Sequence, residues 1–573
     1  MELTTLSILH QDPHPRLDRM LGRQTLTFAF ATGSGGDPFE RLLSKQRVPP
    51  TLFASDCFAP DLFLDSFVER CLLTKLPGTE RRFHLRSLRQ SVAAPPVDLT
   101  DIRLRQAVFQ ELRLPKPYDA CKDTWRLIDG LRVLLESSEM GKRFDPIARR
   151  VEILRQLDQL MRHLIIAFGG TQSALNRIAR FAEQAIASPE YRHLEQLLEY
   201  DDHLATLDVE LRIDRDGQIR SLAIVDQQEN NKHPLYRSPL VRLWQRIAAL
   251  LRGYAVRERE VIGRLIEAVF DSIWPLFLNL LELSLDLEFY LALDGFRRLC
   301  EKQRLDCCMP SVTVTGSNAP LRLEQVYNPF LLLEERRPVP CDLELSGSGL
   351  VLLTGPNSGG KTRLLQSIGF VQLLAQSGAW VPARAATVPL RTGLFVSLVH
   401  ESSSDQREGR LGTELMRIRR LFERLEYDQL VLLDELCSGT NPNEGEEIVE
   451  LVISLLTELR PQAVITTHFL EFAKRLALHP PVAKLSFLQV ALDAHQVPLF
   501  QFVPGVATTS LAHLTAERLG VTREALQTVI RSKRDPEASP VRSAVRTSGI
   551  LLPSENGSLV RASAEDELAK AGE

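Results

Sequence analysis

A short run of glycines between an apolar strand and a helix constrains this chain more than any other feature. Residues 349–354, Gly-Leu-Val-Leu-Leu-Thr, form an apolar run that suits a buried strand. The next eight residues fit the pattern G-x-x-x-x-G-K-[ST], and residues 363–370 continue as a helix. Strand, glycine loop and helix in this order predict a polyphosphate-binding P-loop. The loop residues are Gly355, Pro356, Asn357, Ser358, Gly359, Gly360, Lys361 and Thr362.

Each residue type in this loop has a chemical role. Glycines let backbone N–H groups turn inward toward a phosphate, and the start of the helix adds partial positive charge. Lys361 is predicted to reach the β- and γ-phosphates of ATP, and the Thr362 hydroxyl is predicted to bind Mg²⁺. We therefore expect ATP and Mg²⁺ as cofactors. The alternative is an accidental glycine turn before a helix.

Two more apolar strands end in polar side chains that suit nucleotide chemistry. Residues 430–433 run into Asp434 and Glu435, and residues 463–467 run into His468. We expect Asp434 to hold the Mg²⁺ shell and Glu435 to polarise the attacking water. His468 is a second candidate catalytic residue, as a sensor of the γ-phosphate. The alternatives are a solvated acidic pair and a histidine that caps a helix or fills the core.

Composition and patterning divide the rest of the chain into regions. With 573 residues, 44% hydrophobic and 25% charged, the chain is typical of a globular protein with several domains. Residues 1–95 receive no fold assignment, although alternation over residues 24–31 suggests a strand. Residues 96–310 have helical periodicity, interrupted by a predicted hairpin over residues 207–225. Residues 311–534 alternate strands and helices as an α/β domain does. The predicted helices include residues 102–112, 145–168, 171–198, 238–283 and 285–303.

Charge, cysteines and hydropathy restrict the possible partners and compartment. The net charge of -4 gives no global basic field, so nucleic-acid contacts must come from local patches. The eight cysteines are scattered without a C-x-x-C pair, which indicates reduced thiols in a cytoplasmic protein. No signal peptide is evident, and the apolar residues 273–293 include acidic side chains that favour a buried helix over a membrane span. Residues 535–573 have the composition of a disordered tail.

Several segments together resemble one known family. Residues 354–362, Thr-Gly-Pro-Asn-Ser-Gly-Gly-Lys-Thr, are similar to the T-G-P-N-x-G-G-K-[ST] loop of the MutS family of DNA mismatch-repair and related ATPases. Residues 374–383 are similar to the family's segment after the P-loop helix. Residues 434–445 resemble its D-E-L-G-x-G-T-x-x-x-E-G run, and residues 466–471 its T-H-F-x-E segment. Residues 101–112 resemble the start of its helical core domain.

This resemblance implies an architecture and a mode of action. The expected fold is an α/β P-loop NTPase domain of the ABC-type ATPase class, preceded by a mainly α-helical lever or clamp domain. The resemblance further implies a homodimer with composite ATP sites, in which ATP binding and hydrolysis shift helical arms that grip DNA. The expected partner is mismatched or branched duplex DNA, in mismatch repair or recombination control, held by helices within residues 140–270. No membrane partner is expected.

Two departures from the family pattern bear on function. The family's signature loop carries a Ser that reaches the ATP of the other subunit. Here residues 404–414 look shortened, with Leu411 or Gly412 at the Ser position and Thr413 beside them. The mismatch-reading domain is expected to be missing. The sequence Phe67-Val-Glu matches its Phe-x-Glu wedge, but it lies in an amphipathic run that favours a core side chain.

Three hypotheses for function follow. The first is a DNA-repair or recombination ATPase, the second is a ribosome- or RNA-associated ATPase, and the third is a non-hydrolysing ATP-binding scaffold. Two clusters of arginines either contact phosphates or form solvated helix faces, and we favour the solvated faces. The clusters are Arg417, Arg419, Arg420 and Arg424 on one predicted helix, and Arg149 and Arg150 on another.

Overall fold

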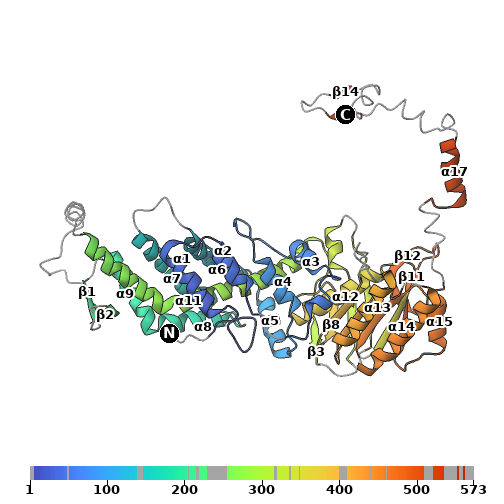
Figure 1. Ribbon diagram of the computed structural model, residues 1–573, viewed down its shortest axis with the longest axis horizontal. Coiled ribbons are helices and arrows are strands. Elements are labelled where there is room, and N and C mark those ends of the chain that lie inside the picture. Colours follow the sequence, from blue (N-terminus) through green and yellow to red (C-terminus); the bar gives the residue numbers. More distant parts are fainter. Residues whose placement is uncertain are drawn as a thin grey trace. The chain divides into compact units, whose positions relative to one another are not determined.

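The computed structural model of this protein is drawn in Figure 1. The residues that the structure describes are 5–47, 51–137, 146–203, 206–213, 219–228, 255–314, 319–334, 337–346, 349–398, 409–437, 441–459, 461–508, 520–534, 551–553 and 559–561. The chain divides into two compact units, Met1–Thr508 and Thr509–Glu573.

The described N-terminal residues are helical. They form α1 (Arg19–Thr32), α2 (Asp37–Ser44), η1 (Ser55–Cys57), α3 (Leu64–Cys71) and α4 (Leu85–Ala93). The strand predicted for residues 24–31 is wrong, because these residues lie inside α1. Asp18 caps this helix by accepting a hydrogen bond from the Leu21 N–H at 2.8 Å. Its buried residues recur at spacings of three and four between Gly22 and Phe30, so the helical period prevails over the short alternation.

The next region is mainly helical and contains the predicted hairpin. Its helices are α5 (Leu99–Glu111), α6 (Pro115–Glu136), α7 (Pro146–Phe168), α8 (Asn176–Ile186), α9 (Pro189–His203) and α11 (Ala255–Lys302). Strands β1 (Thr206–Ile213) and β2 (Ile219–Gln228) pair antiparallel, which confirms the hairpin, while its turn lies outside the described residues.

Helix α11 is one continuous helix where the sequence predicted two. Two helices were expected over residues 238–283 and 285–303, but α11 runs unbroken for 48 residues with Pro275 inside it. Residues 238–254 lie outside the described ranges. The helix predicted over residues 171–198 is instead two helices, α8 and α9, and Pro189 begins the second of them.

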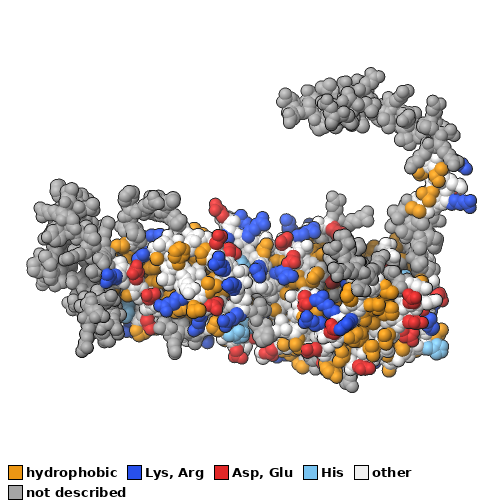
Figure 2. All heavy atoms as spheres, viewed as in Figure 1, with side chains coloured by type: hydrophobic (Ala, Val, Ile, Leu, Met, Phe, Trp, Pro, Cys, Tyr) orange, Lys and Arg blue, Asp and Glu red, His pale blue; other side chains and the backbone are white. Residues whose placement is uncertain are grey.

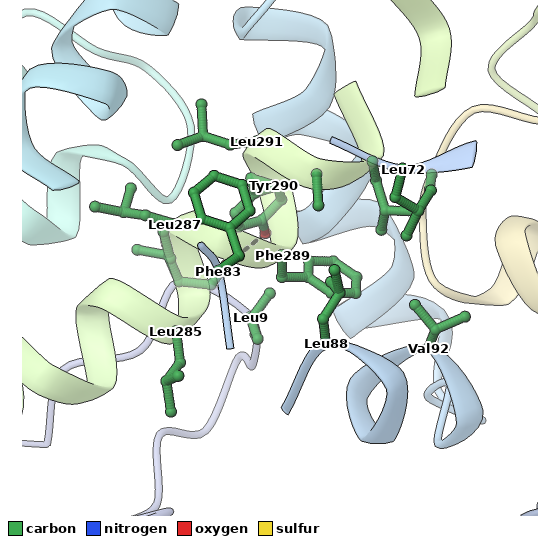
Figure 3. Packing of buried hydrophobic residues seen from close by; sticks show 14 of the residues in the cluster. Leu9, Leu72, Phe83, Leu88, Val92, Leu285, Leu287, Phe289, Tyr290 and Leu291 are labelled. Atoms are coloured by element: carbon green, nitrogen blue, oxygen red, sulfur yellow. Dashed lines mark hydrogen bonds between the residues drawn. The ribbon is translucent and has the colours of Figure 1, made fainter. Parts of the chain in front are cut away.

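Helix α11 lies at the centre of the helical core. Figure 3 shows Phe83 and Leu88, from around the start of α4, packed beside Leu287 and Phe289 of α11, with Leu9 of the N-terminal segment close by. All five side chains are almost completely buried. This part of the chain therefore shares one apolar core, in which the N-terminal segment takes part.

Buried carboxylates on α11 hold the N-terminal segment in place. Glu282 accepts hydrogen bonds from the backbone N–H groups of Arg16 (2.9 Å) and Leu17 (2.7 Å). Asp286 forms a buried ion pair with Arg16 and accepts from the Ile8 N–H at 3.1 Å. Both acids lie within residues 273–293, the apolar stretch that was predicted to be a buried helix, and both are buried. No helix within the described ranges has the length and hydropathy that crossing a membrane requires.

Residues from 311 onward form a mixed α/β region. The main sheet has the strand order β12-β11-β6-β10-β9-β8, in which all neighbouring pairs are parallel except β11 with β12. These strands are β6 (Gly349–Thr354), β8 (Leu394–Ser397), β9 (Leu430–Leu433), β10 (Gln462–Thr467), β11 (Leu485–Leu492) and β12 (Pro498–Pro504).

A smaller second sheet and several helices complete this region. The second sheet has the order β3-β7-β4-β5 and consists of β3 (Ser311–Thr313), β4 (Leu321–Val326), β5 (Cys341–Leu345) and β7 (Ala385–Pro389). Figure 1 shows helices around the main sheet. They are α12 (Lys361–Gln376), α13 (Gly409–Arg424), α14 (Pro442–Leu456) and α15 (Leu470–Leu478), with short turns η2 (Pro329–Leu333) and η3 (Thr457–Leu459).

Four buried phenylalanines, which we call the aromatic joint, connect three parts of the first unit. Phe67 of α3 lies 4.5 Å from Phe370 of α12, 5.8 Å from Phe296 of α11 and 6.5 Å from Phe330 of η2, measured between ring centroids. The Phe67 side chain is fully buried. The alternative that it is a base-stacking wedge is therefore wrong, and the core interpretation is confirmed.

The second compact unit contains α17 (Arg523–Arg534) and the antiparallel pair β13 (Leu551–Pro553) and β14 (Leu559–Arg561). The predicted disordered tail, residues 535–573, lies outside the described residues apart from these two short strands.

Candidate functional site

The glycine loop, residues 355–362, connects β6 to α12 in the predicted order. Gly355 has a φ of 143° and Gly360 a φ of 87°, a region that favours glycine. A Cβ atom on Gly355 would lie 2.6 Å from Cγ2 of Val490, so the close approach of β11 also requires glycine there. Asn357 and Ser358 are exposed at the tip of the loop. The backbone is thus held in a tight turn directly before the start of a helix.

Lys361, the first residue of α12, lies under the loop. Its Nζ donates to the carbonyl oxygens of Gly355 (2.9 Å) and Pro356 (3.2 Å), and lies 3.5 Å from a carboxylate oxygen of Glu435. The side chain is only 3% exposed. Burial lowers the pKa of Lys361, while the nearby Glu435 and Asp434 carboxylates oppose this shift. The loop therefore contains a buried cation, paired in part with an acid from the end of β9.

Asp434 lies between two threonine hydroxyls. Thr362 Oγ1 donates to Asp434 Oδ2 at 2.5 Å, and Thr466 Oγ1 donates to Asp434 Oδ1. Burial raises the pKa of Asp434, and these two hydrogen bonds counteract the shift. Because β6, β10 and β9 are neighbouring parallel strands, their carboxyl ends bring these three residues to one edge of the sheet.

Glu435 is positioned by the backbone as well as by its side chain. Its N–H donates to Thr466 Oγ1 at 2.9 Å, and its φ of 46° lies in the left-handed region. Cys437, which follows two residues later, also has a left-handed φ of 58° and is fully buried. The family's D-E-L-G motif carries a glycine where this chain has Cys437, and the backbone keeps the conformation that glycine favours.

Sequence patterns did not single out Thr466 or Phe500. Thr466 is hidden inside an apolar strand, and only the geometry shows its hydroxyl between Asp434 and the Glu435 N–H. Phe500 of β12 is close to the loop, since a Cβ atom on Gly360 would lie 3.2 Å from Cδ1 of this ring. Phe500 also has a left-handed φ of 57°, which is unusual for a residue other than glycine. Only the structure shows this angle, so no sequence pattern indicated the residue.

His468 follows β10, as predicted, but lies apart from the other candidates. Its half-buried ring is 4.3 Å from the ring of Phe469, measured between centroids. Within the described residues, no hydrogen bond or ion pair joins it to the glycine loop, Asp434 or Glu435. The structure therefore joins Lys361, Thr362, Asp434 and Glu435 by direct contacts and shows no such contact for His468 among the described residues.

The two arginine clusters have structural partners. Arg420 and Arg424 both pair with Asp56 of η1, the second at 3.8 Å. Arg149 donates to the backbone carbonyls of Ala29 and Phe30 at the end of α1, and Arg150 pairs with Glu267 at 2.7 Å. Arg419 pairs with Glu423 at 2.7 Å. The exposed Arg419, Arg420 and Arg424 agree with the solvated helix face, whereas Arg149 is half-buried and bonds to the backbone of α1.

The residues at this edge of the sheet fit a nucleotide with a divalent cation. The first turn of α12 offers backbone N–H groups that lack helical partners, and Lys361 supplies a buried positive charge beside them. Thr362 and Asp434 offer adjoining oxygen atoms, the ligand type that Mg²⁺ prefers.

Residues 351–533 match the family described as MutS domain V. This match and the relatives below agree with the motifs around the glycine loop. Residues 351–533 of this chain are thus similar to the MutS family. MutS domain V is the ATPase domain of that family, and here it includes the glycine loop and the ends of β9 and β10.

The curated relatives carry the name Endonuclease MutS2. The protein from Leuconostoc mesenteroides is 31% identical over 38% of this chain and 26% of its own length. The protein from Geobacillus kaustophilus is 31% identical over 43% of this chain and 31% of its own length. The protein from Clostridium tetani is 25% identical over 55% of this chain and 39% of its own length. The matched region thus spans well under half of each relative.

Proposed function

We propose that this chain is a P-loop ATPase of the ABC-type class, in which ATP binds at residues 355–362. One observation carries the proposal: the ends of β6, β9 and β10 bring Lys361, Thr362, Asp434 and Glu435 together. The loop N–H groups and Lys361 would bind the phosphates. Asn357 and Ser358, at the exposed tip, and Pro356, Gly359 and Gly360 would form the rest of the cradle.

Mg²⁺, when bound, would neutralise charge on the phosphates. Thr362 and Asp434 would hold it, the first directly and the second through its shell. Within the described residues, no group of three or more His, Cys, Asp or Glu side chains is suited to a metal ion. A magnesium ion that takes most of its ligands from phosphates and water matches this sparse set of protein ligands.

Glu435 would orient the attacking water and accept its proton. In the present structure this carboxylate pairs with Lys361, whose Nζ also binds two loop carbonyls. Phosphate binding would draw Lys361 toward the nucleotide and release Glu435 for water. His468, the second candidate, would need to approach the γ-phosphate from its place beside Phe469.

We further propose that ATP binding and hydrolysis drive clamping of mismatched or branched DNA by a cytoplasmic homodimer. The aromatic joint supports such coupling, because it connects α12, which begins in the glycine loop, to the end of the long helix α11. The word endonuclease in the relatives' name describes those proteins. The match covers too little of their length to carry that activity to this chain.

The test is Mg²⁺-dependent phosphate release from ATP by the purified protein. It is run alone and with homoduplex DNA, mismatched duplex, a four-way junction or ribosomes, with Glu435→Gln as the background. Stimulation by a mismatch or junction, absent in Glu435→Gln, is the expected result. Stimulation by ribosomes alone would replace the DNA proposal with a ribosome-associated ATPase.

A non-hydrolysing scaffold is the second candidate, favoured by Leu411 and Gly412 at the position of the family's Ser. Residues 404–408 of this signature loop lie outside the described residues. ATP-dependent dimerisation without phosphate release above the Glu435→Gln background would establish the scaffold and exclude the ATPase.

A further inference from the structure

A cavity of about 570 Å³ lies in the helical part of the first unit, and nothing in the nucleotide site uses it. Its walls come from α2, from the segment that leads into α4, from α6 and from α11. The residues that line it are Glu40, Arg41, Ser44, Arg82, Phe83, His84, Leu85, Arg86, Arg132 and Glu288. None of them belongs to residues 140–270, the proposed DNA clamp, or to the glycine loop. The volume is that of a pocket for a small ligand.

Three of the lining arginines differ from the other arginines nearby. Arg41, Arg82 and Arg86 are exposed, and within the described residues none of them forms an ion pair with a carboxylate. By contrast, Arg81 pairs with Asp129 and Glu136 at 2.7 and 2.6 Å. The guanidinium groups around the cavity are therefore available to an anion from outside the chain.

The two carboxylates of the cavity are already occupied. Glu40 binds Arg132 at 2.7 Å and His84 at 3.3 Å, and these contacts lower its pKa to about 2. Glu288 accepts from the His84 N–H (2.8 Å) and from Trp125 Nε1 (3.0 Å), and burial raises its pKa to about 7. Neither acid contacts the three exposed arginines, so the cavity keeps a net positive charge.

Helix α4 adds backbone donors to this wall. His84 caps the helix by accepting from the Ser87 N–H at 3.1 Å, and the next two residues, Leu85 and Arg86, both line the cavity. N–H groups in the first turn of a helix lack helical partners and carry partial positive charge. They add to the guanidinium groups, whose forked geometry suits phosphate oxygens.

We propose that this cavity binds a phosphate monoester, as carried by a free nucleotide or by the 5′ end of a nucleic-acid strand. A monoester has up to two negative charges and three acceptor oxygens, which three guanidinium groups from two wall segments can share. The phosphodiester backbone of a duplex carries one charge per phosphate and lies along extended surfaces, which this cavity does not provide.

Binding is measured by calorimetry with the full-length protein. The probes are AMP, a 5′-phosphorylated oligonucleotide and the same oligonucleotide with a 5′-hydroxyl. We expect at least one phosphorylated probe to bind about tenfold or more tightly than the hydroxyl form, and this preference to fall about tenfold or more in Arg82→Ala/Arg86→Ala. The control Arg19→Ala/Arg192→Ala removes the same charge from exposed arginines that do not line the cavity and should bind as the parent does.

The different probes distinguish a free nucleotide from a strand end, and the variants distinguish the cavity from the glycine loop. AMP binding alone identifies a free nucleotide as the ligand, and oligonucleotide binding alone identifies a strand end. Lys361→Ala should leave the phosphate preference intact, because the cavity is separate from the glycine loop. Arg41→Ala, on α2, should weaken binding independently of the double variant. Equal binding of the phosphorylated and hydroxyl probes would overturn the proposal. An equal loss of affinity for the phosphorylated probe in the double variant and in its control would also overturn it.

Discussion

Among single residues, Thr466 does most to organise the candidate site. Its hydroxyl donates to Asp434 and accepts from the Glu435 N–H at 2.9 Å, so one side chain fixes both acids at the end of β9. Glu435 and Cys437 have left-handed φ values, which cost about 1 kcal/mol each for residues other than glycine. The contact with Thr466 helps to hold this strained turn.

Thr466→Val is expected to slow ATP hydrolysis about tenfold or more, since it removes two hydrogen bonds worth about 0.5–1.5 kcal/mol each. ATP affinity should change less, because the glycine loop and Lys361 are untouched. Steady-state phosphate release and a nucleotide titration measure the two effects. Thr466→Ser keeps the hydroxyl and should restore most of the rate. A Val variant that hydrolyses ATP at the parent rate would contradict this role.

Among the elements, α11 is defined by acids buried in its apolar surface. Burial raises the pKa of both Glu282 and Glu288 from the ordinary value of 4.5 to about 7. Each acid therefore binds more protons in the folded than in the unfolded chain between these two values. The stability that each protonated acid contributes is fully present below the unfolded pKa and is lost as pH rises through the folded pKa.

Glu282→Gln should therefore flatten the decline of the melting temperature between about pH 5 and pH 8. The amide keeps an acceptor for the Arg16 and Leu17 N–H groups and has no charge to bury. The melting temperature at pH 8 should be a few degrees higher than that of the parent, since the shift is worth on the order of 3 kcal/mol. Asp271→Asn, at an exposed acid of the same helix, is the matched control. A parent-like pH profile in Glu282→Gln would contradict the account.

Local patterns predicted the elements that depend on local signals. The strand β6 and the start of α12 follow from an apolar run and the glycine loop, and the hairpin β1–β2 agrees with the one predicted over residues 207–225. The helix α1 was not predicted, because the alternation of apolar and polar residues over 24–31 resembled a strand more than a helix with a period of 3.6.

The parts that sequence did not predict depend on contacts between distant segments. The hydroxyl of Thr466 meets Asp434 only when β9 and β10 pair, and Phe500 meets Gly360 only when β12 joins the sheet. Neither contact leaves a pattern along the chain, because each involves residues at least 30 positions apart.

The aromatic joint gives a prediction about packing between elements. Phe67→Ala should lower the free energy of unfolding by about 3–5 kcal/mol, because the fully buried ring contacts three other rings and leaves a cavity. Chemical denaturation monitored by circular dichroism measures the loss. Phe28→Ala, at an exposed position of α1, should change stability by less than about 0.5 kcal/mol. Equal stabilities of the two variants would show that the joint does not hold these elements together.

On the scale of the whole molecule, the net charge of -4 means that DNA is not attracted by the chain as a whole. DNA clamping by local contacts to backbone phosphates should then depend steeply on salt. With about six phosphate contacts, the affinity for a mismatched duplex should fall about 10³-fold between 50 and 200 mM salt. Fluorescence anisotropy of a labelled duplex measures the slope. Affinity that is independent of salt would contradict a clamp that holds phosphates.

The first compact unit contains both the candidate nucleotide site and α11, so hydrolysis at the glycine loop is the step on which any coupling depends. The most direct test measures Mg²⁺-dependent ATP binding and phosphate release side by side for the parent and for Glu435→Gln. The account predicts that both proteins bind ATP with similar affinity and that the Gln variant loses about 10²-fold or more of the parent's turnover. Turnover that survives in Glu435→Gln, or a parent that does not bind ATP, would contradict the assignment of this site.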